Sequence, residues 1–83
     1  MTDNLINSIG RYCRAFRMVT LDKTLREVAS KSNSNEKSLS SFEHGRANNI
    51  HHLVCYIKSC EDDKTRDLFY AGLTEQLMKE SVE

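Results

Sequence analysis

The sequence contains no proline and only three glycines among its 83 residues. Because both residues interrupt helices, their scarcity suits a helical protein, and a 29% share of charged residues suits one with solvated faces. No stretch approaches the roughly 18 apolar residues of a membrane span, and residues 1–10 lack the basic start and apolar run of a signal peptide. We therefore expect a soluble, cytoplasmic protein with no membrane contact.

Motifs of catalysis and cofactor binding are also missing. The sequence has neither a P-loop nor a GxGxxG motif. The segment SLSSFEHG, residues 38–45, invites a Ser/His/acid interpretation, but no strained nucleophile turn or oxyanion arrangement accompanies it. We expect no enzymatic activity and no cofactor.

Cysteines are few and odd in number: Cys13, Cys55 and Cys60. Without an export signal, this favours free thiols packed as small apolar residues. A metal site can be built from His51, Cys55 and Cys60, because the first two are four residues apart on a helix face. No CxxC or HxxxH pair supports that site, and we predict no bound metal.

The length allows one modest core, which buries about 60% of the surface of the unfolded chain, and is too short for two. We expect a single domain over residues 1–83. Its charge is zero overall but uneven: residues 1–58 hold nine Lys and Arg against five Asp and Glu, and residues 59–83 hold three against seven. Such a split is typical of a DNA-contacting face backed by an acidic region, although both halves could simply be solvated surface.

The first predicted helix covers residues 4–18. Its apolar residues recur at three- and four-residue spacing and form one stripe: Leu5, Ile9, Tyr12, Cys13 and Phe16. Arg14 lies on the opposite face and Arg17 on the flank, where either could reach a DNA phosphate or remain solvated. The residues around Thr20 are expected to form a linker.

Residues 24–46 predict two short helices joined by a tight polar turn. Thr24 and Glu27 form an S/T-x-x-E capping box, which marks a helix start. Asn35 can cap the second helix, in which Leu39 and Phe42 share one inward face. The outward positions of that helix are Glu36, Lys37, Ser40 and Ser41.

Two more helices follow. Gly45 should end the second helix of the pair as a left-handed cap. The fourth helix, residues 50–60, is expected to bury Ile50, Leu53, Val54 and Ile57. The fifth runs from about 63 to 79, with Phe69, Leu73 and Leu77 packed on the domain.

The fifth helix also carries a second apolar face. Its expected members are Leu68, Ala71, Gly72 and Met78. This surplus favours a homodimer or another partner at this face, with Gly72 allowing close helix approach. The alternative is that a small helical domain covers both faces of the helix.

Residues 24–46 resemble the helix-turn-helix of the Cro/repressor type, the XRE-like family. The matching residues are Thr24, Val28, Ala29, Asn35, Leu39, Ser40, Phe42, Glu43, Gly45 and Arg46. Residues 9–17 are similar to the first helix of that family, so the resemblance covers about half of the chain. It implies an all-α, compact, five-helix, phage-repressor-like domain, with the helix-turn-helix at 24–43.

The resemblance also implies a function: sequence-specific binding of double-stranded DNA by a phage or prokaryotic transcriptional regulator of the repressor type, in the cytosol or nucleoid. The helix at 35–43 would lie in the major groove, with base contacts from Glu36, Lys37, Ser40 and Ser41. Backbone contacts are expected from Thr24, Arg26, Asn35, His44, Arg46, Asn48, Arg14 and Arg17. Arg46 could instead pair with Glu43 or another carboxylate.

Three residues depart from the family pattern. Leu25 replaces a Gln that anchors a phosphate or reads a base, Glu36 places an acid where phosphates would lie, and Asn33 replaces a turn glycine. The first two favour a rival hypothesis, in which the fold is a protein-binding module: an antirepressor, a phage-encoded inhibitor of a host protein, or an antitoxin.

Overall fold

The computed structural model describes residues 2–32, 34–46 and 50–81. Five α-helices follow one another: α1 (Thr2–Ala15), α2 (Leu25–Ala29), α3 (Glu36–Glu43), α4 (His52–Ser59) and α5 (Asp63–Ser81). Two short helical segments lie between them. The wider π-helix η1 (Phe16–Leu21) follows α1, and the tighter 3-10 helix η2 (Ser30–Ser32) follows α2. The described residues form no strand, which confirms the predicted all-α class with five helices. None of these helices is both long enough and apolar enough to cross a membrane.

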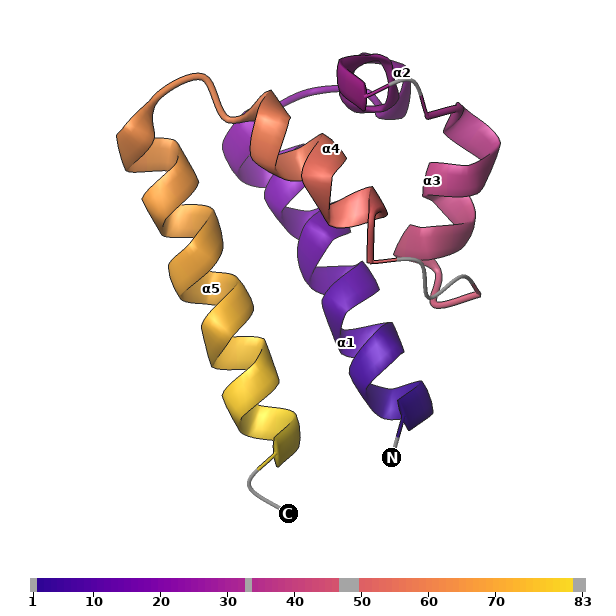
Figure 1. Cartoon of the computed structure of the whole chain (residues 1–83), viewed down its shortest axis with the longest axis vertical. Coiled ribbons are helices and arrows are strands. Elements are labelled where there is room, and N and C mark those ends of the chain that lie inside the picture. The colour runs from indigo at the N-terminus through magenta and orange to yellow at the C-terminus, as the bar shows by residue number, and fades with distance from the viewer. Residues whose placement is uncertain (1, 33, 47–49, 82–83) are drawn as a thin grey trace.

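The helices are arranged around α1 (Figure 1). The long helix α5 runs antiparallel to α1 along one side of it, and α3 packs on α1 from another side. The short helices α2 and α4 contact each other, and α2 also contacts α3. The pair α2 and α3 therefore lies across the molecule from α5 (Figure 1).

Aromatic side chains from α1, α3, α4 and α5 fill the core. Phe69 of α5 is fully buried and meets Phe16 edge-on, with ring centroids 4.9 Å apart. Its ring stacks on that of Tyr56 from α4 at 6.3 Å. Leu39 and Phe42 of α3 are buried, as their spacing predicts, and so are the free thiols of Cys13, Cys55 and Cys60.

Two glycines allow helices to approach closely. A Cβ at Gly10 would lie 2.5 Å from the carbonyl oxygen of Phe42, so α1 and α3 can cross only with glycine there. A Cβ at Gly72 would collide with the ring and hydroxyl of Tyr12, which donates a hydrogen bond to the carbonyl of Phe69 at 2.8 Å. The expected close approach at Gly72 is thus to α1 of the same chain.

The linker expected around Thr20 is instead helical. α1 continues into the π-helix η1, which ends at Asp22 in a left-handed conformation with φ 53°. Arg17 accepts at its carbonyl from the amides of Asp22 and Lys23, so the wide turn keeps its backbone bonded. Met18 and Val19 are exposed on this turn.

The buried face of α4 differs from the predicted one. Ile50 precedes the helix and is 73% exposed, whereas Tyr56 and Cys55 are fully buried. Leu53 is buried as expected, and Val54 and Ile57 are half-buried. Tyr56 faces inward because its ring fills the core and its hydroxyl donates to the buried carboxylate of Glu43.

Candidate nucleic-acid interface

The start of α2 has the geometry that its sequence predicts. The Thr24 hydroxyl accepts from the Glu27 amide at 3.1 Å, and the Glu27 carboxylate accepts from the Thr24 amide at 2.8 Å. The hydrogen bond that the carboxylate accepts from the Thr24 backbone holds the pKa of Glu27 below its usual value. Val28 and Ala29 are buried on the opposite side of the helix. The capping box is therefore confirmed, and it orients α2 at the surface.

The start of α3 is held by two side-chain contacts. The Asn35 side chain accepts from the Ser38 amide at 2.7 Å and caps α3. The buried Cys55 thiol of α4 donates to the Ser34 hydroxyl at 3.3 Å. Asn33 lies outside the described residues. These contacts fix the beginning of α3 against α4.

The outward face of α3 carries the residues expected there. Glu36 and Lys37 are exposed, and Ser40 and Ser41 are half-buried. On the inward face, Leu39 and Phe42 pack into the core. The first turn of α3 is thus the part of this helix most open to a partner.

Glu43, at the last turn of α3, is the centre of a buried polar network. Its carboxylate receives two hydrogen bonds from Arg17, from Nε at 2.8 Å and Nη2 at 3.0 Å, and one from the Tyr56 hydroxyl at 2.6 Å. The side chain of Glu43 is only 2% exposed. The hydrogen bond to Glu43 raises the pKa of Arg17. The pKa of Tyr56 is raised first by burial and then by its hydrogen bond to the Glu43 carboxylate. The network ties α3 to η1 and α4.

The expected role of Arg17 needs correction. Its guanidinium is 12% exposed, paired with Glu43, and its Nη1 also donates to the Lys23 carbonyl at 3.0 Å. A group held inside by three hydrogen bonds is not free to contact a phosphate. The alternative pairing of Arg46 with Glu43 does not occur either, because Arg17 and Tyr56 occupy that carboxylate.

Glu36 is neutralised by a neighbour on α2. Its carboxylate lies 3.2 Å from Nε of Arg26, and both side chains are solvent-accessible. Leu25, the other departure from the family pattern, is half-buried and packs against the core cluster. One departure therefore has a packing role, and the other forms a surface ion pair across the two helices.

The remaining residues expected to contact DNA are mostly exposed. Thr24 and Asn35 are accessible, although each uses a side-chain oxygen as a helix cap. The His44 Nδ1 lies 2.8 Å from the Ser40 carbonyl, which can only accept, so Nδ1 carries the proton. Arg14 and Arg46 are exposed. Asn48 lies outside the described residues.

The second apolar face of α5 is only partly as expected. Leu68, Ala71 and Met78 are exposed. Gly72 lies against Tyr12 of α1 and not on that face, which contradicts its expected place in a dimer surface. Leu77, expected in the core, is 41% exposed. The outer surface of α5 thus carries more apolar area than the sequence pattern suggests.

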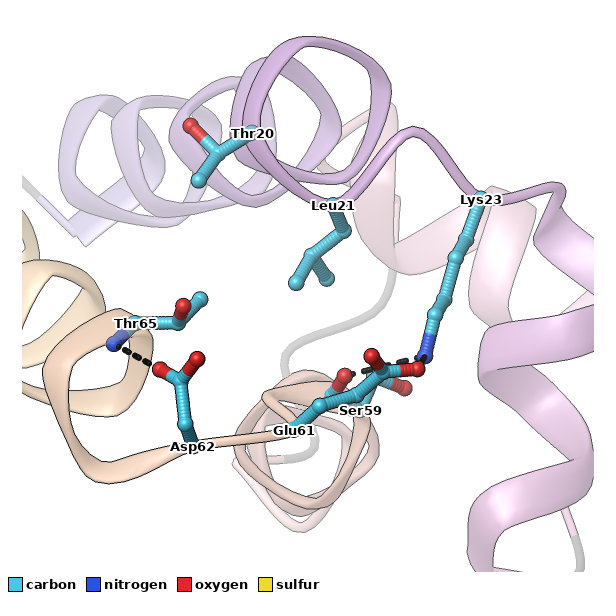
Figure 2. A pocket seen from close by; sticks show the side chains of 7 residues that line it. All are labelled: Thr20, Leu21, Lys23, Ser59, Glu61, Asp62 and Thr65. Atoms are coloured by element: carbon cyan, nitrogen blue, oxygen red, sulfur yellow. Dashed lines mark hydrogen bonds and ion pairs between the residues drawn. The ribbon is translucent and has the colours of Figure 1, made fainter.

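A small polar cleft lies where η1, the end of α4 and the start of α5 meet (Figure 2). Its volume is about 120 Å³, and it is lined by Thr20, Leu21, Lys23, Ser59, Glu61, Asp62 and Thr65. Lys23 donates to the Ser59 carbonyl at 3.1 Å and pairs with Glu61, and Asp62 accepts from the Thr65 amide. Its polar groups therefore mainly bond one another and join α5 to the domain.

Within the described ranges, no three His, Cys, Asp or Glu side chains are placed to hold a metal ion. No family model, curated protein or solved structure matches this chain. Its function must be inferred from its own residues.

Proposed function

We propose that the chain is a sequence-specific DNA-binding regulator, in which α2 and α3 form a helix-turn-helix of the Cro/repressor type. The observation that carries the proposal is the pairing of two capped helices at the surface, with α3 fastened by its buried end and open at its first turn. A rigidly oriented, accessible helix is what the major groove admits.

The first turn of α3 supplies the base contacts in this proposal. Lys37 is exposed and makes no ion pair within the described residues, so it can donate to guanine acceptors. Ser40 and Ser41 add short contacts along the same edge. Glu36 accepts from a cytosine amino group or stays paired with Arg26, which offsets its charge.

Backbone contacts come from the surrounding exposed groups. The set that remains after Arg17 is removed comprises Thr24, Arg26, Asn35, His44, Arg46 and Arg14, with Asn48 beyond the described residues. Basic residues predominate in this half of the sequence, and the acidic segment begins near α5, across the molecule. Binding should therefore weaken as salt increases.

The test begins with selection of bound duplexes from a random DNA pool, followed by fluorescence anisotropy at low and moderate salt. Lys37→Ala should weaken binding to the selected site by about 1–3 kcal/mol and relax one base position. Lys58→Ala is the matched control, since Lys58 is an exposed lysine on α4. It should leave the base preference unchanged.

Two results would contradict the proposal. Failure to enrich any sequence, together with negligible binding at low salt, would rule out DNA as the partner. If Lys37→Ala and Lys58→Ala lowered DNA affinity equally on all sequences, both lysines would make only general electrostatic contacts. Lys37 on α3 would then not read a base.

The second candidate is a protein-binding module, as in an antirepressor, an inhibitor of a host protein or an antitoxin. The observation that favours it is the Arg26–Glu36 pair, in which a carboxylate offsets one of the two positive charges beside the first turn of α3. If the chain binds only a protein, Glu36→Gln leaves DNA binding absent. Under the DNA-binding hypothesis the same change should strengthen non-specific binding, because a negative charge facing phosphates is removed, and should alter the base preference at the position that Glu36 contacts.

A further inference from the structure

Two arginines pair with glutamates, and they differ in which of their donors remain available. Arg17 binds Glu43 through both Nε and Nη2, its Nη1 donates to the Lys23 carbonyl, and its side chain is only 12% exposed. Arg26 contacts Glu36 through Nε alone, at 3.2 Å, and its side chain is 83% exposed. Neither terminal nitrogen of Arg26 donates a hydrogen bond to any of the residues that the structure describes. Arg26 therefore keeps both terminal nitrogens available for a partner outside the chain.

The Arg26–Glu36 pair lies where the first turns of α2 and α3 meet. Leu25 is the first residue of α2 and packs against the core, whereas Arg26, the next residue, is exposed. Glu36 is the first residue of α3. The hydrogen bond between the two side chains therefore brings the guanidinium from α2 to the start of α3. In the proposed complex, the first residues of α3 are the ones that reach base edges.

A guanidinium held in this way has the chemistry to recognise guanine. It is planar and always charged, and it can donate two hydrogen bonds together to O6 and N7 of guanine in the major groove. A carboxylate bound at Nε leaves the two terminal nitrogens unobstructed and limits the positions that this long, exposed side chain can take. Pairing also offsets the negative charge of Glu36, which alone would repel phosphates.

We propose that Arg26 reads a guanine in the major groove and that Glu36 positions it for that contact. This inference rests on the proposed DNA-binding function and changes two assignments within it. Arg26 contacts a base in place of the DNA backbone, and Glu36 contacts Arg26 in place of a base. Lys37 keeps its own contact beside them. Sequence specificity therefore comes from both helices of the pair, and not from α3 alone.

The first test exchanges arginine for lysine in the full chain and measures fluorescence anisotropy on the duplex that the wild type selects. Arg26→Lys keeps the positive charge but removes the paired donors, so affinity for the selected site should fall about tenfold to a hundredfold. The preference for guanine at one base pair should relax, and binding to unrelated DNA should be unchanged. Arg14→Lys, at an exposed arginine of α1, is the matched control and should change neither affinity nor base preference.

The second test asks whether Glu36 acts through Arg26. Glu36→Ala should relax the preference at the same base pair as Arg26→Lys does, although it removes a charge that repels phosphates. The double variant should lose no more preference there than Arg26→Lys alone, because both changes remove one contact. Relaxation at a different base pair would mean that Glu36 contacts a base itself, and would overturn its positioning role. Both side chains are exposed, and far-UV circular dichroism checks that each variant is folded.

The outcomes separate this inference from the function on which it rests. If the wild type enriches no sequence, the proposed function fails and the inference fails with it. If the wild type selects a site and Arg26→Lys binds that site with unchanged affinity and preference, Arg26 contacts a phosphate. The inference is then wrong, while the proposed function stands. A relaxed base pair that is not G·C would also overturn the inference.

Discussion

Helices α3 and α5 are held in place in different ways. The shorter one, α3, is capped at its start by Asn35 and fastened at its end by Glu43, which joins Arg17 and Tyr56. The longer one, α5, relies on a single packed side around Phe69 and Gly72, and its last turns expose Leu77 and Met78. Length and firmness of attachment are therefore separate properties, and directional polar contacts make the short helix the more precisely oriented one.

The variant with the largest expected effect is Glu43→Ala, which tests whether the buried polar network holds α3 in place. It leaves the buried guanidinium of Arg17 without its partner and should destabilise the domain by about 3–5 kcal/mol. Urea denaturation followed by circular dichroism measures the loss. The control is Glu36→Ala, which removes an exposed ion pair and should cost less than about 1 kcal/mol. Equal losses for the two variants would mean that the network does not anchor α3.

A smaller effect is expected on the α5 side. Gly72→Ala places a methyl group against the Tyr12 ring and hydroxyl, and the overpacking should cost about 1–3 kcal/mol despite the better helix propensity of alanine. Thr74→Ala, at an exposed position of the same helix, is the control and should be nearly neutral. If Gly72→Ala stabilised the protein in urea denaturation, α5 would not be held as closely to α1 as described.

Removing a cap should have a still smaller effect. Asn35→Ala deletes the oxygen that accepts from the Ser38 amide and should cost about 1 kcal/mol, concentrated in the first turn of α3. Hydrogen exchange should show faster exchange in α3 and unchanged exchange in α5. Asn35→Asp keeps an acceptor and should restore most of the protection; uniform loss across both helices would argue against a local cap effect.

The smallest expected effect is a pH dependence confined to the α3 and α4 side. His52 is buried beside Phe42, with ring centroids 5.3 Å apart, and burial followed by the charge of His51 lowers its pKa from 6.5. Because the folded state then binds the proton less well than the unfolded state, this contribution to stability is complete above pH 6.5 and declines as the pH falls below it. Urea midpoints should fall on acidification, and less so for His52→Gln. Identical pH dependence in the two proteins would exclude His52 as the cause.

Local sequence signals predicted the elements well. The capping box at Thr24, the cap at Asn35, the left-handed Gly45 with φ 75° and the extent of α5 all agree with the structure. Each depends on hydrogen bonds or backbone angles within a few residues. Such signals are readable without knowing what packs where.

The contacts between distant residues could not be predicted in the same way. From the sequence alone, Glu43 is expected at the surface. In the structure it is buried, because Arg17 and Tyr56 donate to it from other helices. Tyr56 is buried because its hydroxyl reaches Glu43, and Gly72 faces inward because Tyr12 lies against it there. The roles of Lys37 and the α3 face in DNA binding stay predictions, since they concern a partner and not the fold.

The π-helix at residues 16–21 positions both helices of the proposed DNA-binding pair. Arg17 lies in this segment and donates to Glu43 at the end of α3. The segment ends at Asp22, whose left-handed φ of 53° redirects the chain just before the Thr24 cap of α2. The same six-residue turn therefore fixes where α3 ends and where α2 begins.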